Sequence, residues 1–164
     1  MGDQLRAYLH RVWGQVHERT GRPFDKDAID RYPEGWVYDT SMPCQALIAM
    51  RKMSPPQEFP FFGALQTAFY RDAQDLTDPD VYPPILDNFK VIQDQFLKLL
   101  HAPETAEEVA ADFRRTRAMG AQGLPCLFVS DGDSVTMVAR GFQKARMIQN
   151  TLDVLFPQLK RSPA

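Results

Sequence analysis

The feature that most constrains the fold is that strand-forming sequence is confined to one short stretch, residues 120–142, GAQGLPCLFVSDGDSVTMVARGF. An apolar run follows Pro125, a turn cluster with Asp-Gly at its centre covers 130–134, and a second strand-like run begins at Val135. Two such runs joined by an Asp-Gly turn predict a β-hairpin. Because two strands alone are marginally stable, the hairpin must pack against helices or pair with further strands.

Helical periodicity dominates the rest of the chain. Thr105 and Glu108 match a capping box, in which the two side chains satisfy backbone donors at a helix start, and Gly120 is a suitable residue to end that helix. A first helix is predicted over residues 3–20, and its apolar stripe consists of Leu5, Leu9, Val12, Trp13 and Val16. A second helix is predicted from Thr40 or Ser41 to before Pro55, and a third has Phe62, Leu65, Phe69 and Ala73 on one face. Two more helices are predicted, one that starts near Pro83 or Pro84 and one over residues 144–156. We therefore expect a single domain over 1–164, with a helical part at 3–119 and a ββα part at 120–158.

Composition excludes several classes of function. The 164 residues carry 19 basic and 21 acidic side chains, interspersed to a net charge of −2, so we expect no nucleic-acid partner and no membrane partner. The N-terminus carries Asp3 and Arg6 where a secretory signal would be apolar, and no apolar run is long enough to span a bilayer. We therefore expect a cytoplasmic protein.

Four blocks of the sequence resemble one family. HRVWGQVHERTGRPFD, WVYDTSMPCQALIAMR, ALQTAFYRDAQDLTDPDVY and DFRRTRAMGAQGLPCLFV, in this order, are similar to DsbA-like thioredoxin-fold oxidoreductases, particularly the FrnE-like branch. The resemblance runs from about residue 8 to residue 156. It implies an α/β thioredoxin-like fold, here mostly helical, in which a helical insertion precedes a C-terminal β-hairpin and helix. It also implies a cis Leu124-Pro125 bond and substrate binding by Gly123, Leu124, Pro125 and Cys126.

The sequence departs from this family at its beginning. Family members start with a βαβ unit that carries a Cys-x-x-Cys motif, and such a unit needs about 30 residues or more. The first predicted helix leaves no such room before Leu5. The resemblance therefore implies a thioredoxin fold without the N-terminal half, with no catalytic residue carried over and no dithiol activity in this chain. Three alternatives for this departure stay open: a truncated gene product, a fragment with a mis-set start, or a diverged form.

The two cysteines are the remaining redox candidates. Cys44 lies early in a predicted helix, where the helix dipole could lower its pKa, and Cys126 opens the first strand. Free cysteines are usually buried packing residues, and we favour that interpretation for both. A Cys44–Cys126 disulfide would need the two Cα atoms within about 7 Å and is disfavoured in a cytosolic protein. His10, His17 and His101 have no converging ligands, so we expect no metal site.

Three functions remain open. The first, which we prefer, is a DsbA-family protein related to protein thiol:disulfide oxidoreductases, with no cofactor and a protein or peptide thiol as substrate. The second is a glutathione-dependent isomerase of the 2-hydroxychromene-2-carboxylate type, with glutathione bound near Leu124 and Pro125. The third is a non-enzymatic binding or assembly module. An unpaired hairpin edge also leads us to expect a homodimer that covers it.

Overall fold

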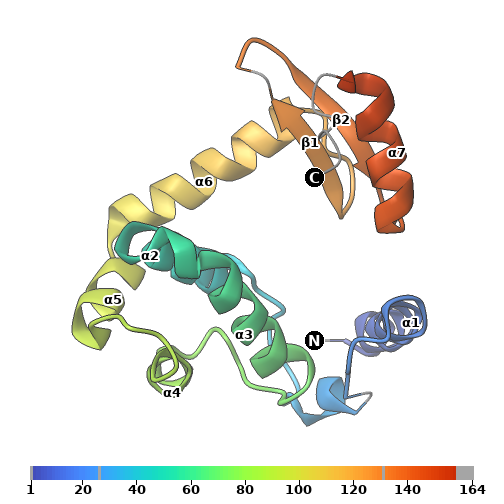
Figure 1. Cartoon of the computed structure of the whole chain (residues 1–164). Helices are drawn as coiled ribbons and strands as arrows, with labels where there is room; N and C mark the ends of the chain where they lie inside the picture. Colours follow the sequence, from blue (N-terminus) through green and yellow to red (C-terminus); the bar gives the residue numbers. More distant parts are fainter. Residues whose placement is uncertain (1, 26, 131, 158–164) are drawn as a thin grey trace. The chain divides into compact units, whose positions relative to one another are not determined.

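The computed structural model describes residues 2–25, 27–130 and 132–157, and its chain divides into two compact units, Met1–Ala110 and Ala111–Ala164 (Figure 1). The first unit is helical, and the second contains the β-hairpin and the last helix. The boundary falls inside a helix, before the Gly120 at which the sequence predicts the change from helix to strand.

The helical unit contains five complete α-helices within its described residues, together with three short 3-10 turns and the start of a sixth helix. Its helix bounds are α1 Asp3–Thr20, η1 Ala28–Arg31, α2 Ser41–Met53, η2 Pro55–Gln57, α3 Glu58–Tyr70, η3 Pro79–Val81, α4 Tyr82–Leu86, α5 Gln93–Leu100 and α6 Pro103–Ala118. The prediction of a helix over 3–20 is confirmed. The prediction of a helix that starts near Thr40 or Ser41 and ends before Pro55 is also confirmed, since α2 starts at Ser41 with Thr40 as its N-cap. Helix α2 packs against both α3 and α5 (Figure 1).

Large side chains that α2, α3, α4 and α5 contribute form the core of this unit. Phe61, Tyr82 and Phe96 are fully buried. The Phe61 ring makes an edge contact with Phe96 at 5.5 Å between centroids, a geometry that favours aromatic pairs beyond the area they bury. The Tyr82 hydroxyl donates to the Leu76 carbonyl at 2.7 Å, which satisfies the one polar atom of that buried side chain.

Helix α1 attaches to the rest of the unit through a narrower apolar face than the sequence predicts. Leu9 and Trp13 are buried, whereas Leu5 and Val16 remain exposed. The Trp13 ring meets Tyr70 edge-on at 5.1 Å between centroids. Beyond this contact, the Arg6 guanidinium donates to backbone carbonyls of the segment that follows α1, including Tyr32 at 2.8 Å. Hydrogen bonds from Arg6 therefore hold one end of α1, because only part of its predicted apolar stripe is buried.

Two predicted helices differ from those observed. The buried face of α3 begins at Phe61 rather than Phe62, which is 42% exposed, because the helix turns Phe61, Leu65 and Phe69 inward. The single helix predicted from Pro83 or Pro84 is two helices, α4 and α5. Turns over 87–91 separate them, because Phe89 N–H bonds the Leu86 carbonyl at 2.8 Å and the helix stops there.

The predicted capping box at Thr105 is wrong. Helix α6 already begins at Pro103, whose fixed φ and missing N–H suit a first helical position. Thr105 therefore lies inside the first turn, where its backbone N–H bonds the Ala102 carbonyl at 3.0 Å. Its side chain is fully buried, and its hydroxyl has no hydrogen-bond partner among the described residues. The end of the helix near Gly120 is confirmed, since α6 stops at Ala118 and Gly120 has the left-handed φ of +80°.

The second unit contains the predicted hairpin and helix. Strands β1 Cys126–Ser130 and β2 Val135–Arg140 pair antiparallel, with an irregularity in register between Leu127 and Phe128, and helix α7 Ala145–Leu155 packs against β2. Val138 and Ala139 of β2 are the buried hydrophobic residues of these three elements. Asp131 of the predicted turn, and residue 158 at the end of the predicted ββα part, lie outside the described residues.

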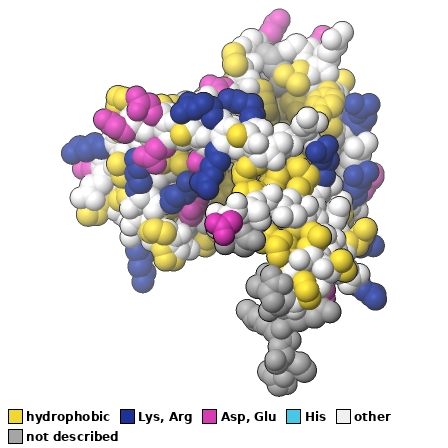
Figure 2. Space-filling view, turned by 90° about the horizontal axis from the view of Figure 1, so that it is seen from above, with side chains coloured by type: hydrophobic (Ala, Val, Ile, Leu, Met, Phe, Trp, Pro, Cys, Tyr) yellow, Lys and Arg dark blue, Asp and Glu magenta, His cyan; other side chains and the backbone are white. Residues whose placement is uncertain are grey.

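The molecular surface carries charges of both signs. On the face seen in Figure 2, basic and acidic side chains lie close together with hydrophobic patches among them. Among the described residues, no helix combines the length and the apolar character that crossing a bilayer would require.

Candidate functional site

The loop before β1 carries the predicted substrate-binding residues Gly123 to Cys126. Gly123 has a φ of +86°, a backbone conformation that residues with a Cβ rarely adopt. The Leu124-Pro125 peptide bond is cis. The Pro125 carbonyl accepts a hydrogen bond from Gly141 N–H at 2.8 Å, which ties the loop to the end of β2. Leu124, at 88% exposure, projects its side chain away from the unit's own core. The loop thus presents an apolar residue on a backbone fixed at both sides.

Cys126 lies at the start of β1, opposite Arg140 in the register of the hairpin. Its side chain is partly exposed, and its Sγ donates to the Gly123 carbonyl at 3.2 Å. The thiol therefore folds back onto the loop rather than into a packed core, which differs from the buried packing role expected from the sequence.

Cys44 occupies the first turns of α2 in the helical unit, where its backbone N–H bonds the Thr40 carbonyl at 3.1 Å. Burial raises the pKa of its thiol, and the neighbouring Asp39 carboxylate raises it further. The helix dipole therefore does not produce a lowered pKa here, and the raised pKa agrees with the packing role that the sequence favoured for Cys44. Both cysteines are free.

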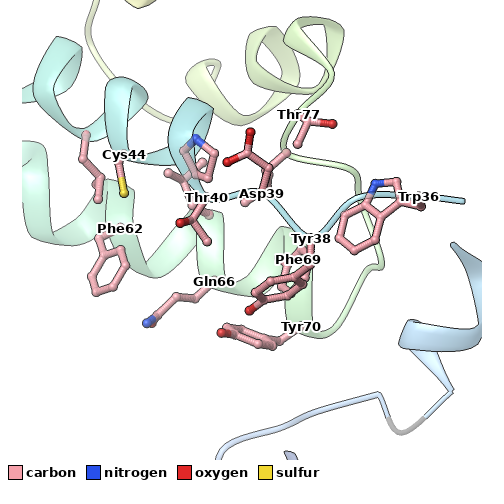
Figure 3. A pocket seen from close by; sticks show the side chains of 14 residues that line it. Trp36, Tyr38, Asp39, Thr40, Cys44, Phe62, Gln66, Phe69, Tyr70 and Thr77 are labelled. Atoms are coloured by element: carbon pink, nitrogen blue, oxygen red, sulfur yellow. The ribbon is translucent and has the colours of Figure 1, made fainter. Parts of the chain in front are cut away.

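Cys44 forms part of the wall of a pocket in the helical unit (Figure 3). The pocket has a cavity volume of about 180 Å³ and lies between the segment that leads into α2, one face of α3, and the loop at Leu76 and Thr77. Most of its lining is apolar. The lining residues are Trp36, Tyr38, Asp39, Thr40, Pro43, Cys44, Leu47, Phe62, Leu65, Gln66, Phe69, Tyr70, Leu76 and Thr77.

A hydrogen bond and a ring contact hold Trp36, on the aromatic side of this pocket, in place. The Trp36 indole N–H donates to Asp75 at 2.7 Å, and the Trp36 ring stacks on Phe69 with 6.2 Å between centroids. Burial raises the pKa of Tyr70, whose ring lies beside that of Phe69. Tyr70 therefore remains a neutral phenol at physiological pH.

One charged group lines the pocket. The Asp39 carboxylate accepts hydrogen bonds from the Ser41 hydroxyl at 2.7 Å and the Ser41 N–H at 2.8 Å. These bonds hold its pKa below the ordinary value, so Asp39 stays ionised. The sequence did not lead us to predict a pocket at this place. The available signal was the run WVYDT, in which two aromatic residues and then two polar residues directly precede a helix.

Two of the histidines make contacts within the helical unit. His10 Nε2 lies 3.0 Å from an Asp30 oxygen, and His17 Nδ1 lies 2.6 Å from the Arg22 carbonyl. In the part of the chain that the structure describes, no three His, Cys, Asp or Glu side chains converge as metal ligands would.

Solved structures provide the comparison with known proteins. A "putative protein disulfide isomerase" from Nitrosomonas europaea matches with a TM-score of 0.89 and 27% identity, over 97% of this chain and 77% of that chain. The cytosolic disulfide reductase DsbM from Pseudomonas aeruginosa matches with a TM-score of 0.76 and 20% identity, over 98% and 79%. The same protein with GSH matches with a TM-score of 0.73 and 21% identity, over 98% and 78%.

No family model matches the sequence, and neither does any curated protein. The structural matches extend over both units, because they cover nearly the whole chain. At 20–21% identity the DsbM structures show the fold, whereas the Nitrosomonas protein adds a higher identity and a higher TM-score. Together these matches support placing the chain in a DsbA-like thioredoxin-fold family of thiol oxidoreductases.

Proposed function

We propose that this protein belongs to the FrnE-like branch of that family and binds an extended, cysteine-containing polypeptide at the loop of Gly123, Leu124, Pro125 and Cys126. The observation that carries the proposal is the exposed Leu124-Pro125 turn at the mouth of β1, in a chain whose fold follows that of a "putative protein disulfide isomerase". The ββα unit then serves as the C-terminal half of a thioredoxin-type site.

The hydrogen bonds of the loop support this role. The Pro125 carbonyl is already occupied by Gly141, and the Gly123 carbonyl by the Cys126 thiol. Between these two hydrogen-bonded carbonyls, the Leu124 side chain is 88% exposed and can contact an apolar group of a substrate. A substrate segment would thus meet a preformed surface, which reduces the ordering cost of binding.

We propose that these 164 residues do not themselves perform dithiol exchange. The sequence contains no Cys-x-x-Cys motif. Cys44 carries a thiol whose pKa is raised by burial, and a raised pKa lowers the fraction of reactive thiolate. A cytoplasmic location follows from the same resemblance, and the neighbour DsbM is described as cytosolic.

A binding experiment tests the role of the loop. A fluorescently labelled insulin B chain with blocked thiols is titrated with the protein, and anisotropy is measured. We expect Leu124→Asp to weaken binding, because it places a charge where the substrate meets the apolar side chain. Val154→Asp is the matched control, since Val154 is 78% exposed on α7 of the same unit. Equal affinity for the Leu124→Asp variant and the wild-type protein would refute the role of the loop.

An insulin reduction assay tests the absence of dithiol activity. With dithiothreitol as reductant, we expect insulin precipitation no faster than with dithiothreitol alone. An acceleration that Cys126→Ser abolishes would contradict the proposal and assign catalysis to that thiol.

A glutathione-dependent isomerase is the second candidate, because one of the solved neighbours is described as DsbM with GSH. In this alternative, glutathione binds beside Leu124 and Pro125. Calorimetric titration with reduced glutathione separates the two functions. If glutathione binds and Leu124→Asp abolishes that binding, the isomerase-like function is favoured. If the titration gives no binding heat, the polypeptide is favoured as the ligand.

A further inference from the structure

We infer that the pocket between α3 and the segment that leads into α2 is a binding site for one aromatic side chain of an extended polypeptide. This inference goes beyond the proposed function, because the pocket lies in the helical unit and needs neither cysteine chemistry nor the loop at Leu124. The partner is a polypeptide segment with an exposed phenylalanine, tyrosine or tryptophan.

The size of the pocket selects the ligand. Its volume of about 180 Å³ is close to the roughly 150 Å³ of an apolar protein cavity that binds benzene. Sites for whole small molecules are larger, roughly 300–1,000 Å³. A single ring therefore fills this pocket, and the rest of a ligand must lie outside it, as in interfaces where one aromatic anchor enters a pocket.

The chemistry of the walls suits an aromatic ring. Figure 3 shows the rings of Tyr38, Phe69 and Tyr70 gathered on one side, and the Cys44 sulfur pointing toward Phe62 on the other. Aromatic walls favour edge and offset contacts with an incoming ring, and a sulfur atom contacts ring edges favourably.

The surroundings of the pocket indicate a polypeptide rather than a small aromatic molecule. Phe59 on α3 is 82% exposed and Val37 is 68% exposed, so apolar surface continues along both segments that form the pocket. On the pocket lining, the Thr40 hydroxyl and the Gln66 amide have no hydrogen-bond partner among the described residues. These two groups can bond to peptide backbone beside the anchoring ring, because each can both donate and accept.

Protection of Cys44 from alkylation tests the site. In the full chain carrying Cys126→Ser, Cys44 is the single thiol, and its reaction with iodoacetamide is followed by mass spectrometry. The probes are the peptides acetyl-GGFGG-amide and acetyl-GGAGG-amide, and the amino-acid derivative N-acetylphenylalaninamide. We expect the phenylalanine peptide to slow alkylation several-fold at saturation, the alanine peptide to have no effect, and the free derivative to bind more weakly than the phenylalanine peptide.

A substitution that covers the pocket provides the second measurement. We expect Gln66→Trp, in the same Cys126→Ser background, to abolish binding of the phenylalanine peptide measured by calorimetry. Gln4→Trp is the matched control, because Gln4 is also an exposed helical glutamine and lies on α1 away from the pocket lining. Circular dichroism checks that both variants retain their helices.

Three results would overturn the inference. The first is an unchanged alkylation rate with the phenylalanine peptide, and the second is equal peptide binding by Gln66→Trp and Gln4→Trp. The third is equal affinity for N-acetylphenylalaninamide and the phenylalanine peptide, which would assign the pocket to a small aromatic molecule. Because Leu124→Asp leaves this pocket intact, failure of the loop proposal and failure of this inference give different results.

Discussion

Replacing Thr105 by valine should stabilise the protein, which is unusual for a substitution at a fully buried position. The Thr105 side chain has 0% exposure, and its hydroxyl has no hydrogen-bond partner among the described residues. A hydroxyl buried without a partner costs about 1–3 kcal/mol of desolvation. Valine replaces the hydroxyl by a methyl group of similar shape, and the helix propensities of the two residues are similar. We therefore expect Thr105→Val to raise the free energy of unfolding by about 1–3 kcal/mol.

Urea unfolding followed by circular dichroism measures this change, with two control variants. Thr105→Ser keeps the hydroxyl and loses a buried methyl group, so it should destabilise the protein by about 1 kcal/mol. Thr67→Val removes a hydroxyl that donates to the Gly63 carbonyl at 3.0 Å, so it should bring no gain. If Thr105→Val unfolds at the same or lower urea concentration than the wild type, with an unchanged m-value, the hydroxyl is satisfied in solution and the reasoning is refuted.

The remaining predictions concern a buried hydrogen bond, the thiol in the pocket and the hairpin edge. Tyr82→Phe leaves the buried Leu76 carbonyl without its 2.7 Å donor and should cost about 1–3 kcal/mol in urea unfolding; an unchanged stability would show that this bond contributes nothing. In the Cys126→Ser background, Cys44 alkylation should be slower than that of free cysteine at pH 8 and should rise with pH beyond about 8.5, because burial raises its pKa; a rate equal to that of free cysteine would contradict this. Folding stability should fall over the same alkaline range, since the unfolded state releases the Cys44 proton at a lower pH, and Cys44→Ala should reduce that fall. Sedimentation at micromolar concentration should show a homodimer that covers the hairpin edge, and a monomer would exclude it.

Elements with strong local signals were predictable from the sequence. Residues 3–20 form the expected helix, because apolar residues recur there at helical spacing and because Gly21 and Pro23 mark its end. The hairpin was predictable because an Asp-Gly pair separates two strand-like runs of sequence. Helix α7 was predictable because its apolar residues recur at helical spacing, a signal that needs no distant partner. The loop at Leu124 was located because Gly123, Pro125 and the strand that follows are adjacent in the sequence.

Positions that depend on distant partners were not predictable. The inward face of α3 starts at Phe61 because Phe89 and Phe96 pack against that ring, and neither is close to it in sequence. The pKa of Cys44 rises because neighbouring segments bury the thiol, an effect opposite to that of the local helix dipole.

The sequence by itself determined the order of the elements, the break at Gly120 and the resemblance to DsbA-like proteins, because each is encoded in neighbouring residues. The tertiary structure alone decided the pocket beside Cys44 and the unpartnered hydroxyl of Thr105. A pocket exists where packed segments fail to fill the space between them, and a hydroxyl lacks a partner when no acceptor lies within reach. Both properties depend on the distances between residues far apart in the chain.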